Sequence, residues 1–146
     1  MPSWYLGKIN YQQEQENGAL KTIHEAYLID AVSYTDAEAR LYGIVADNTP
    51  DFKITSLTRM KLSDVFDFEE SGEKWFRCKM FYVSIDDRKG AAKERKIVSF
   101  MLVNADSPKQ AIERIEKSLA TMLIPYEITD VNLTPILEIH PFKTEG

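Results

Sequence analysis

Two stretches of the chain, WYLGKINY (residues 4–11) and WFRCKMFY (residues 75–82), decide the fold. Both are rich in aromatic and β-branched residues, a composition that favours β-strands. Placed over one another without a gap, they share a tryptophan, a lysine and a tyrosine at matching positions: Trp4 with Trp75, Lys8 with Lys79, and Tyr11 with Tyr82. The sequence therefore predicts the same strand at the start of two similar halves.

Two further matches follow in the same order along the chain. SYTDAEAR (33–40) is similar to ADSPKQAI (105–112), and FKIT (52–55) is similar to YEIT (126–129). Recurrence of similar segments is the signature of an internal repeat, and small loop insertions explain the slight drift in register. The three matches predict a tandem duplication, with repeats at about 3–68 and 74–142.

Each half also carries a signal for the start of a helix. In a capping box, a Ser or Thr and a Glu or Gln three residues later satisfy free backbone N–H groups of the first turn. Thr35-x-x-Glu38 has this spacing in the first half, and Ser107-x-x-Gln110 has it in the second. Pro108 suits the first helical position, where its missing N–H costs nothing. The spacing predicts helices over about 36–47 and 108–122.

The other predicted elements are strands. They span about 4–11, 22–32, 52–61, 75–85, 96–104 and 126–133, and extended segments follow at 62–68 and 136–142. Pro135 and Pro141 place the last segment at a sheet edge, because proline cannot donate a ladder hydrogen bond. We expect an α+β fold: a tandem duplication of a β-β-α-β unit, with two helices packed on a mainly antiparallel sheet and pseudo-twofold symmetry. Residues 67–74 would link the halves within a single domain, 1–146.

Composition narrows the class of protein. Hydrophobic residues make up 44% of the 146 residues and charged residues 28%, which is typical of a folded globular domain. A net charge of −5 disfavours a protein whose whole surface binds duplex DNA. The single cysteine, Cys78, allows no internal disulfide and fits a reducing compartment. Because neither a membrane span of about 20 apolar residues nor a signal peptide is recognisable, we expect a cytoplasmic protein without a membrane partner.

Three longer segments together resemble a known family. WYLGKINY, EAYLIDAVSYTDAEAR (25–40) and KWFRCKMFYVSIDDRKGAAKERK (74–96) are similar to an uncharacterised family catalogued as domain of unknown function 4494. The resemblance covers essentially the whole chain. It implies an intracellular protein of Bacteroidota or of the phages that infect them, and it transfers no catalytic residue.

The residues that could carry catalysis lack the necessary neighbours. By strand alternation Cys78 lies on an apolar face, which is typical of a buried structural thiol. His24 and His140 have no metal-ligand spacing. The acidic start of residues 86–90 lacks the alternating oxygen ligands of a calcium loop and fits a hairpin turn. We therefore expect no enzyme, no catalytic residue, no metal site and no cofactor.

A binding surface is the more specific prediction. The outward faces of the two matching strands combine aromatic and basic residues, a composition that suits single-stranded nucleic acid, because bases stack on rings while Lys and Arg neutralise phosphates. The predicted hairpin loop DDRKGAAKERK (86–96) adds further positive charge. The candidate nucleic-acid-binding residues are Trp4, Lys8, Trp75, Arg77, Lys79, Phe81, Arg88, Lys89, Lys93 and Arg95.

Other interpretations of the same face stay open. A tryptophan at the start of a strand can cover the end of a core, and Lys and Arg can simply keep a sheet soluble. Trp, Tyr and Arg are also enriched at protein interfaces, so the face could bind a partner protein or a second copy of the chain. A small molecule bound between the halves is a further alternative, without a residue to support it.

Overall fold

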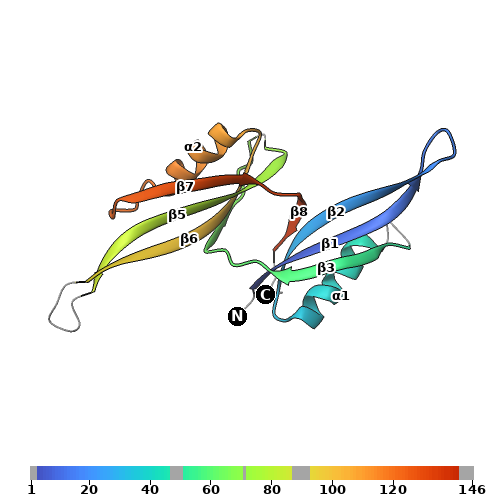
Figure 1. Ribbon diagram of the computed structural model, residues 1–146, viewed down its shortest axis with the longest axis horizontal. Helices are drawn as coiled ribbons and strands as arrows, with labels where there is room; N and C mark the ends of the chain where they lie inside the picture. The colour runs from blue at the N-terminus through green and yellow to red at the C-terminus, as the bar shows by residue number, and fades with distance from the viewer. Residues whose placement is uncertain (1–2, 47–50, 71, 87–92, 142–146) are drawn as a thin grey trace. The chain divides into compact units, whose positions relative to one another are not determined.

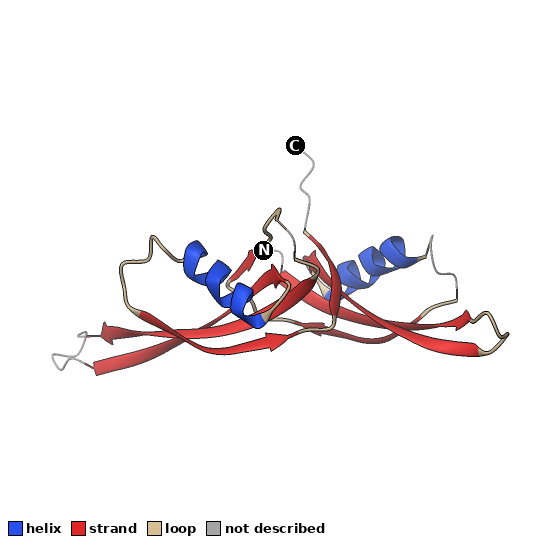
Figure 2. Ribbon diagram, turned by 90° about the horizontal axis from the view of Figure 1, so that it is seen from above, coloured by secondary structure: helices blue, strands red, loops and turns tan. Residues whose placement is uncertain are grey.

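The computed structural model describes residues 3–46, 51–70, 72–86 and 93–141 of the chain. The chain forms two compact units, one made of Met1–Lys61 with Pro135–Gly146 and the other of Leu62–Thr134. Within the described ranges, each unit has one helix lying on one face of a four-stranded sheet (Figures 1 and 2). The expected α+β class, with two helices and mainly antiparallel sheets, is confirmed.

The first unit contains β1 (Ser3–Glu14), β2 (Leu20–Ala31), α1 (Tyr34–Val45), β3 (Lys53–Arg59) and β8 (Ile136–His140). Its sheet has the order β3-β1-β2-β8, in which β8 runs parallel to β2 and the other neighbours are antiparallel. The core lies between the sheet and α1, which buries Ala37, Leu41 and Val45 at helical spacing. Gly7 of β1 has no room for a side chain, because a Cβ atom there would lie 2.8 Å from Cδ2 of Leu41.

The second unit contains β4 (Asp64–Phe66), β5 (Lys74–Asp86), β6 (Lys93–Ala105), α2 (Pro108–Ser118) and β7 (Tyr126–Leu133). Its sheet has the order β4-β6-β5-β7, in which β4 runs parallel to β6 and the other neighbours are antiparallel. Alternate residues of β5, including Phe76, Cys78 and Met80, face α2 and form the core with Ala111 and Ile115 of the helix.

The fourth strand of each sheet comes from an unexpected part of the chain. β4 follows β3 in sequence but pairs with β6 of the second unit, and β8 follows β7 but pairs with β2 of the first unit. Both trailing segments that were predicted as extended therefore form strands, and neither joins the sheet of the strand that precedes it in the chain. β8 lies at a sheet edge, as Pro135 predicted.

Two local predictions were wrong. Residues 93–96, predicted as part of the hairpin loop, belong to β6, because β5 and β6 stay paired from Lys74 opposite Ala105 to Asp86 opposite Lys93. Helix α1 begins at Tyr34, earlier than predicted, because Ser33 and not Thr35 is its N-cap. The Ser33 hydroxyl accepts a hydrogen bond from the Asp36 backbone N–H at 3.1 Å, and the Asp36 carboxylate accepts one from the Val32 N–H.

The cap of α2 agrees with the prediction. The Ser107 hydroxyl accepts a hydrogen bond from the Gln110 backbone N–H at 3.1 Å, and the Gln110 side-chain oxygen accepts one from the Asp106 N–H at 2.7 Å. The side chain at the third helical position therefore reaches one residue beyond the cap. Pro108 stands at the first helical position, where it was expected.

The segment predicted as a linker is anchored to the second unit by a buried asparagine. The Asn104 side chain accepts a hydrogen bond from the Phe68 N–H at 2.7 Å and donates one to the Phe68 carbonyl at 2.8 Å. The Arg114 guanidinium donates to the Asn104 carbonyl at 2.7 Å and lies 5.0 Å from the centre of the Phe68 ring. These contacts anchor the chain at Phe68, two residues after the end of β4.

Replacing Asn104 with alanine should destabilise the protein. The Phe68 N–H and carbonyl would lose their side-chain partners, so we expect the free energy of unfolding to fall by about 1–3 kcal/mol. Urea denaturation followed by circular dichroism measures the change. Asn132→Ala is the matched control, because Asn132 is exposed on β7 and its replacement should change stability by less than about 0.5 kcal/mol. Equal effects of the two substitutions would contradict the anchoring role.

Candidate functional site

Three of the predicted binding residues share the face of β5 that points away from α2. Arg77, Lys79 and Phe81 alternate with the core residues of that strand, and all three are partly exposed. The alternation in WFRCKMFY therefore separates a core face from an outer face, as predicted. The next residues on the outer face are Val83 and Ile85, which extend it toward the end of the hairpin.

The neighbouring strand β6 contributes an aromatic ring that the sequence prediction missed and a lysine that it had counted in the basic hairpin loop. Phe100 lies opposite Lys79, and Lys96 lies opposite Val83. The Arg77 guanidinium lies 4.2 Å from the centre of the Phe100 ring, and the Lys96 ammonium lies 4.2 Å from the centre of the Phe81 ring. Each ring is thus paired with a cation. We define the β5–β6 face as Arg77, Lys79, Phe81, Val83, Lys96, Val98 and Phe100.

Trp75 does not offer a stacking surface. Only 7% of its surface is exposed, although it belongs to the outer side of β5 by alternation. Its backbone carbonyl accepts hydrogen bonds from the N–H and the hydroxyl of Thr134, at 2.9 and 2.8 Å. The burial of its indole supports the structural interpretation, in which a tryptophan at the start of the strand closes the end of the packed region.

The corresponding residues of the first unit have different surroundings. Trp4 is half-buried and Lys8 is exposed on β1, on the side opposite the core residues Tyr5 and Ile9. The next outer residue is Asn10, whose partner across the hairpin is His24. The combination of rings and cations therefore does not continue along β1 as it does along β5. Because Trp4 and Lys8 belong to another unit, they are not part of the β5–β6 face.

Apart from Lys96, the basic residues of the predicted hairpin loop divide into two groups. Arg88 and Lys89 lie outside the described residues. Lys93 and Arg95 are exposed on β6, but Arg95 lies opposite Ser84 and therefore belongs to the α2 side of the sheet. Lys93, two residues away, shares that side. The structure thus separates Lys93 and Arg95 from Arg77, Lys79 and Phe81.

Acidic residues border the β5–β6 face along β7. Asp130 lies opposite Lys79 and Glu127 lies opposite Phe81. A register shift between Lys79 and Met80 makes β7 bulge at this point, and the Thr129 hydroxyl donates a hydrogen bond to the Lys79 carbonyl at 3.3 Å. A cationic strand therefore lies directly beside an acidic one.

A partly buried cluster of one carboxylate and two tyrosines in the first unit was also not predicted from the sequence. The hydroxyls of Tyr11 and Tyr27 donate hydrogen bonds to the two carboxylate oxygens of Glu25, at 3.4 and 3.0 Å. Burial and this carboxylate raise the pKa of Tyr27, and the same two causes raise the pKa of Tyr11. Both phenols are therefore held protonated, so the cluster acts as a fixed hydrogen-bond network.

The remaining candidate residues for catalysis are dispersed. His24 is exposed, and Nε2 of His140 lies 3.1 Å from the Glu138 carboxylate. Across the ranges that the structure describes, no three His, Cys, Asp or Glu side chains come together as metal ligands would. Neither α1 nor α2 has the length and hydrophobicity required to cross a membrane.

Cys78 should react slowly with alkylating agents in the folded protein. The side chain is buried, and burial raises the pKa of its thiol to about 11, so the reactive thiolate is scarce below that pH. We expect negligible labelling by iodoacetamide at pH 8 in native buffer and rapid labelling after unfolding in guanidinium chloride. Mass spectrometry at timed intervals measures both rates. Fast labelling of the folded protein would show that the thiolate is accessible and would support a role of Cys78 as a nucleophile.

Comparison with known proteins adds one match. The model of a family described as "Domain of unknown function (DUF4494)" matches residues 3–142. No curated protein and no solved structure gave a significant match.

Proposed function

The chain belongs to the DUF4494 family, and because that description assigns no activity, we propose a function from the geometry. The protein is a non-catalytic binding module that holds single-stranded nucleic acid on the β5–β6 face. One observation carries this proposal: Phe81 and Phe100 lie on the same face of neighbouring strands, and each ring is paired with a cation at 4.2 Å.

The face supplies both kinds of contact that single strands need. The partly exposed rings of Phe81 and Phe100 offer surfaces on which unpaired bases can stack. Arg77, Lys79 and Lys96 stand around the rings and can neutralise backbone phosphates. Stacking tolerates any base, so the expected binding is sequence-independent and sensitive to salt.

The acidic border limits the path of the nucleic acid. Glu127 and Asp130 repel phosphates from β7, so a bound strand would follow β5 and β6. The chain's net charge of −5 permits this local attraction, since screening confines electrostatic interactions to about 8 Å at physiological salt.

Truncating the rings should weaken the binding of labelled single-stranded DNA and RNA. We expect Phe81→Ala and Phe100→Ala each to lose about 1–3 kcal/mol of binding free energy, because each removes one stacking surface. Lys79→Ala should reduce the slope of log K against log salt by about 0.7, the value for one phosphate contact on a single strand. Fluorescence anisotropy of labelled oligonucleotides, titrated at several salt concentrations, measures both quantities.

Lys21→Ala provides the matched control. Lys21 is exposed on β2 of the other unit, so its loss changes the net charge as Lys79→Ala does but leaves the β5–β6 face intact. Absence of salt-sensitive binding in the micromolar range would refute the nucleic-acid proposal. Equal weakening by Lys21→Ala and Lys79→Ala would show only a nonspecific charge effect.

Exposed aliphatic residues favour a protein partner as the second candidate function. On the same face, Val83 is 44% exposed, Ile85 69% and Val98 43%. Exposed apolar surface with charged residues around it is common at interaction sites. A second copy of the chain docking there would raise the mass measured by light scattering, and Ile85→Lys should restore the monomer mass. A monomer at all concentrations would exclude the homodimer.

We also infer that the two units arose by tandem duplication, because matching positions make matching contacts. The Thr55 hydroxyl donates to the Lys8 carbonyl at a β-bulge in β3, as the Thr129 hydroxyl donates to the Lys79 carbonyl in β7. Ser33 and Ser107 cap the two helices in the same way. These contacts support pairing Ser33 with Ser107, two residues away from the pairing that sequence similarity alone indicated.

The single cysteine bears on location. Cys78 is free and buried, which suits a reducing compartment, and we infer a cytoplasmic protein.

A further inference from the structure

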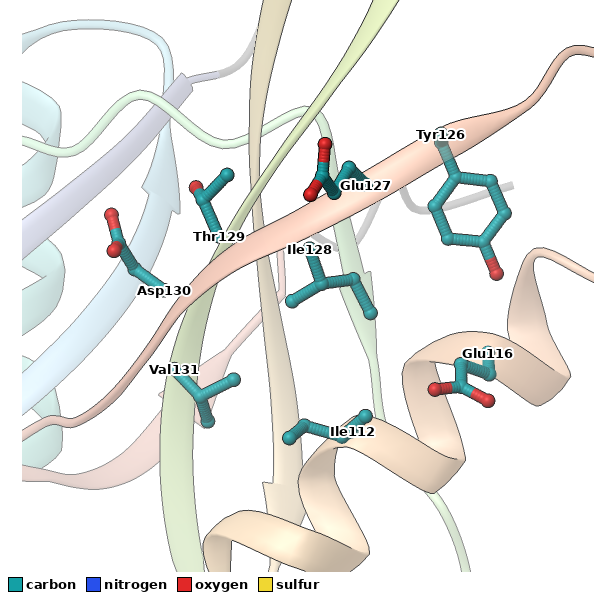
Figure 3. Close-up of a pocket in the computed structure, with 8 residues that line it drawn as sticks. All are labelled: Ile112, Glu116, Tyr126, Glu127, Ile128, Thr129, Asp130 and Val131. Carbon is teal, nitrogen blue, oxygen red and sulfur yellow. The ribbon is translucent and has the colours of Figure 1, made fainter.

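A groove with a volume of about 490 Å³ lies between α2 and β7 of the second unit (Figure 3). β7 is an edge strand, since among the residues that the structure describes its only neighbour in the sheet order is β5. An edge strand leaves a row of backbone N–H and C=O groups available for pairing with another chain. The groove therefore runs along a surface that can accept an additional strand.

The two faces of β7 differ in chemistry. Ile128 and Val131 point toward α2, where Ile112 lies, and form an apolar floor (Figure 3). Glu127 and Asp130 point to the other side of β7, and Glu116 lies on the helix (Figure 3). Three of the eight lining residues are acidic and none is basic. An occupant must therefore combine aliphatic and cationic groups.

The bulge at Thr129 creates this clustering of acids. In a regular strand, residues three positions apart point to opposite faces. Because β7 gains an extra residue between Asp130, opposite Lys79, and Ile128, opposite Met80, Glu127 and Asp130 come to lie on one side of the strand. The backbone irregularity thus brings the two acids together on the face of β7 that points away from α2.

We propose that this groove binds an extended segment of a partner protein in which Lys or Arg alternates with Val or Ile. The segment would pair with the free edge of β7 as an added strand. Its aliphatic side chains would contact Ile112, Ile128 and Val131, and its cationic side chains would contact Glu127 and Asp130. The charge of the lining selects a basic partner.

The same charges disfavour a second copy of this chain in the groove. Pairing β7 with β7 of another copy would bring the Glu127 and Asp130 carboxylates of both copies onto one small sheet edge. Like charges placed across paired strands are destabilising. A basic segment would instead place opposite charges across the paired strands, because its Lys or Arg side chains neutralise both acids.

The corresponding place in the first unit is aromatic and less acidic. There the Tyr42 ring of α1 packs against Phe52, with ring centres 5.3 Å apart. By the FKIT and YEIT match, β3 carries Lys53 and Ser56 where β7 carries Glu127 and Asp130. The proposed site is therefore a property of the second unit alone.

A synthetic peptide tests the proposal directly. The probe is a short fluorescein-labelled peptide in which Lys alternates with Val, titrated with the full-length protein and followed by fluorescence anisotropy. A peptide with Glu in place of Lys tests the charge requirement, and one with a central Pro tests backbone pairing. We expect micromolar to submillimolar binding of the Lys–Val peptide only, with amide NMR shifts concentrated in β7 and around Ile112.

Charge reversal then separates the groove from general attraction. Glu127→Lys/Asp130→Lys should weaken Lys–Val binding by at least about tenfold, because it places like charges at the contact. Glu14→Lys/Glu16→Lys makes the same change in net charge at exposed positions of the first hairpin and should leave binding nearly unchanged. Circular dichroism verifies that both variants remain folded.

Several results would overturn the proposal: no binding of the Lys–Val peptide, equal binding of the proline peptide, or equal weakening by the two double variants. The peptide proposal can also be tested independently of the nucleic-acid proposal. The Glu127→Lys/Asp130→Lys variant should bind single-stranded DNA more tightly and the Lys–Val peptide more weakly, because the two ligands carry opposite charge. A parallel DNA titration of the same variant distinguishes the two sites.

Discussion

The parallel pairing of β4 with β6 and of β8 with β2 is the constraint on which the rest of the structure depends. Each pairing fills one edge of a sheet with a segment that follows the third strand of the other unit. The remaining edges are therefore β3 in one sheet and β7 in the other. The edge of β7 is open because β4 joins the opposite edge of that sheet and no strand of the described chain pairs with β7 there.

Local sequence pattern identified most of the elements, with errors at the start of α1 and of β6, but it did not indicate this pairing. The alternation in WFRCKMFY identified the buried and outer sides of β5, and Pro108 with Ser107 located the start of α2. The trailing segments were recognised as extended, yet nothing in a short strand specifies which distant strand it will join. Hydrogen-bonded partners in a sheet are chosen by the whole fold, so the exchange of β4 and β8 could not be inferred from residues 62–68 and 136–142.

The full β5–β6 face could be identified only once the register between β5 and β6 was known. Arg77, Lys79 and Phe81 were predicted from one strand, but Phe100 and Lys96 join them only because β6 pairs with β5 without a shift. The same register places Arg95 on the other side of the sheet. The sequence left two interpretations of Trp75 open, a stacking surface or a cover for the end of the core, because alternation tells which side a residue takes and does not tell what packs over it.

The bulge at Thr129 gives neighbouring strands opposite charge and so couples their ligands. Asp130 lies opposite Lys79, within the range over which unscreened charges interact. A cationic segment bound to Asp130 would reduce the competition for Lys79 and leave that ammonium more available to a phosphate. Thermodynamic linkage makes the effect mutual: nucleic acid bound to the β5–β6 face would raise the affinity for the basic segment by the same factor. In the free protein Asp130 competes with phosphate for Lys79. A partner bound to Asp130 would thereby control how strongly the β5–β6 face binds nucleic acid.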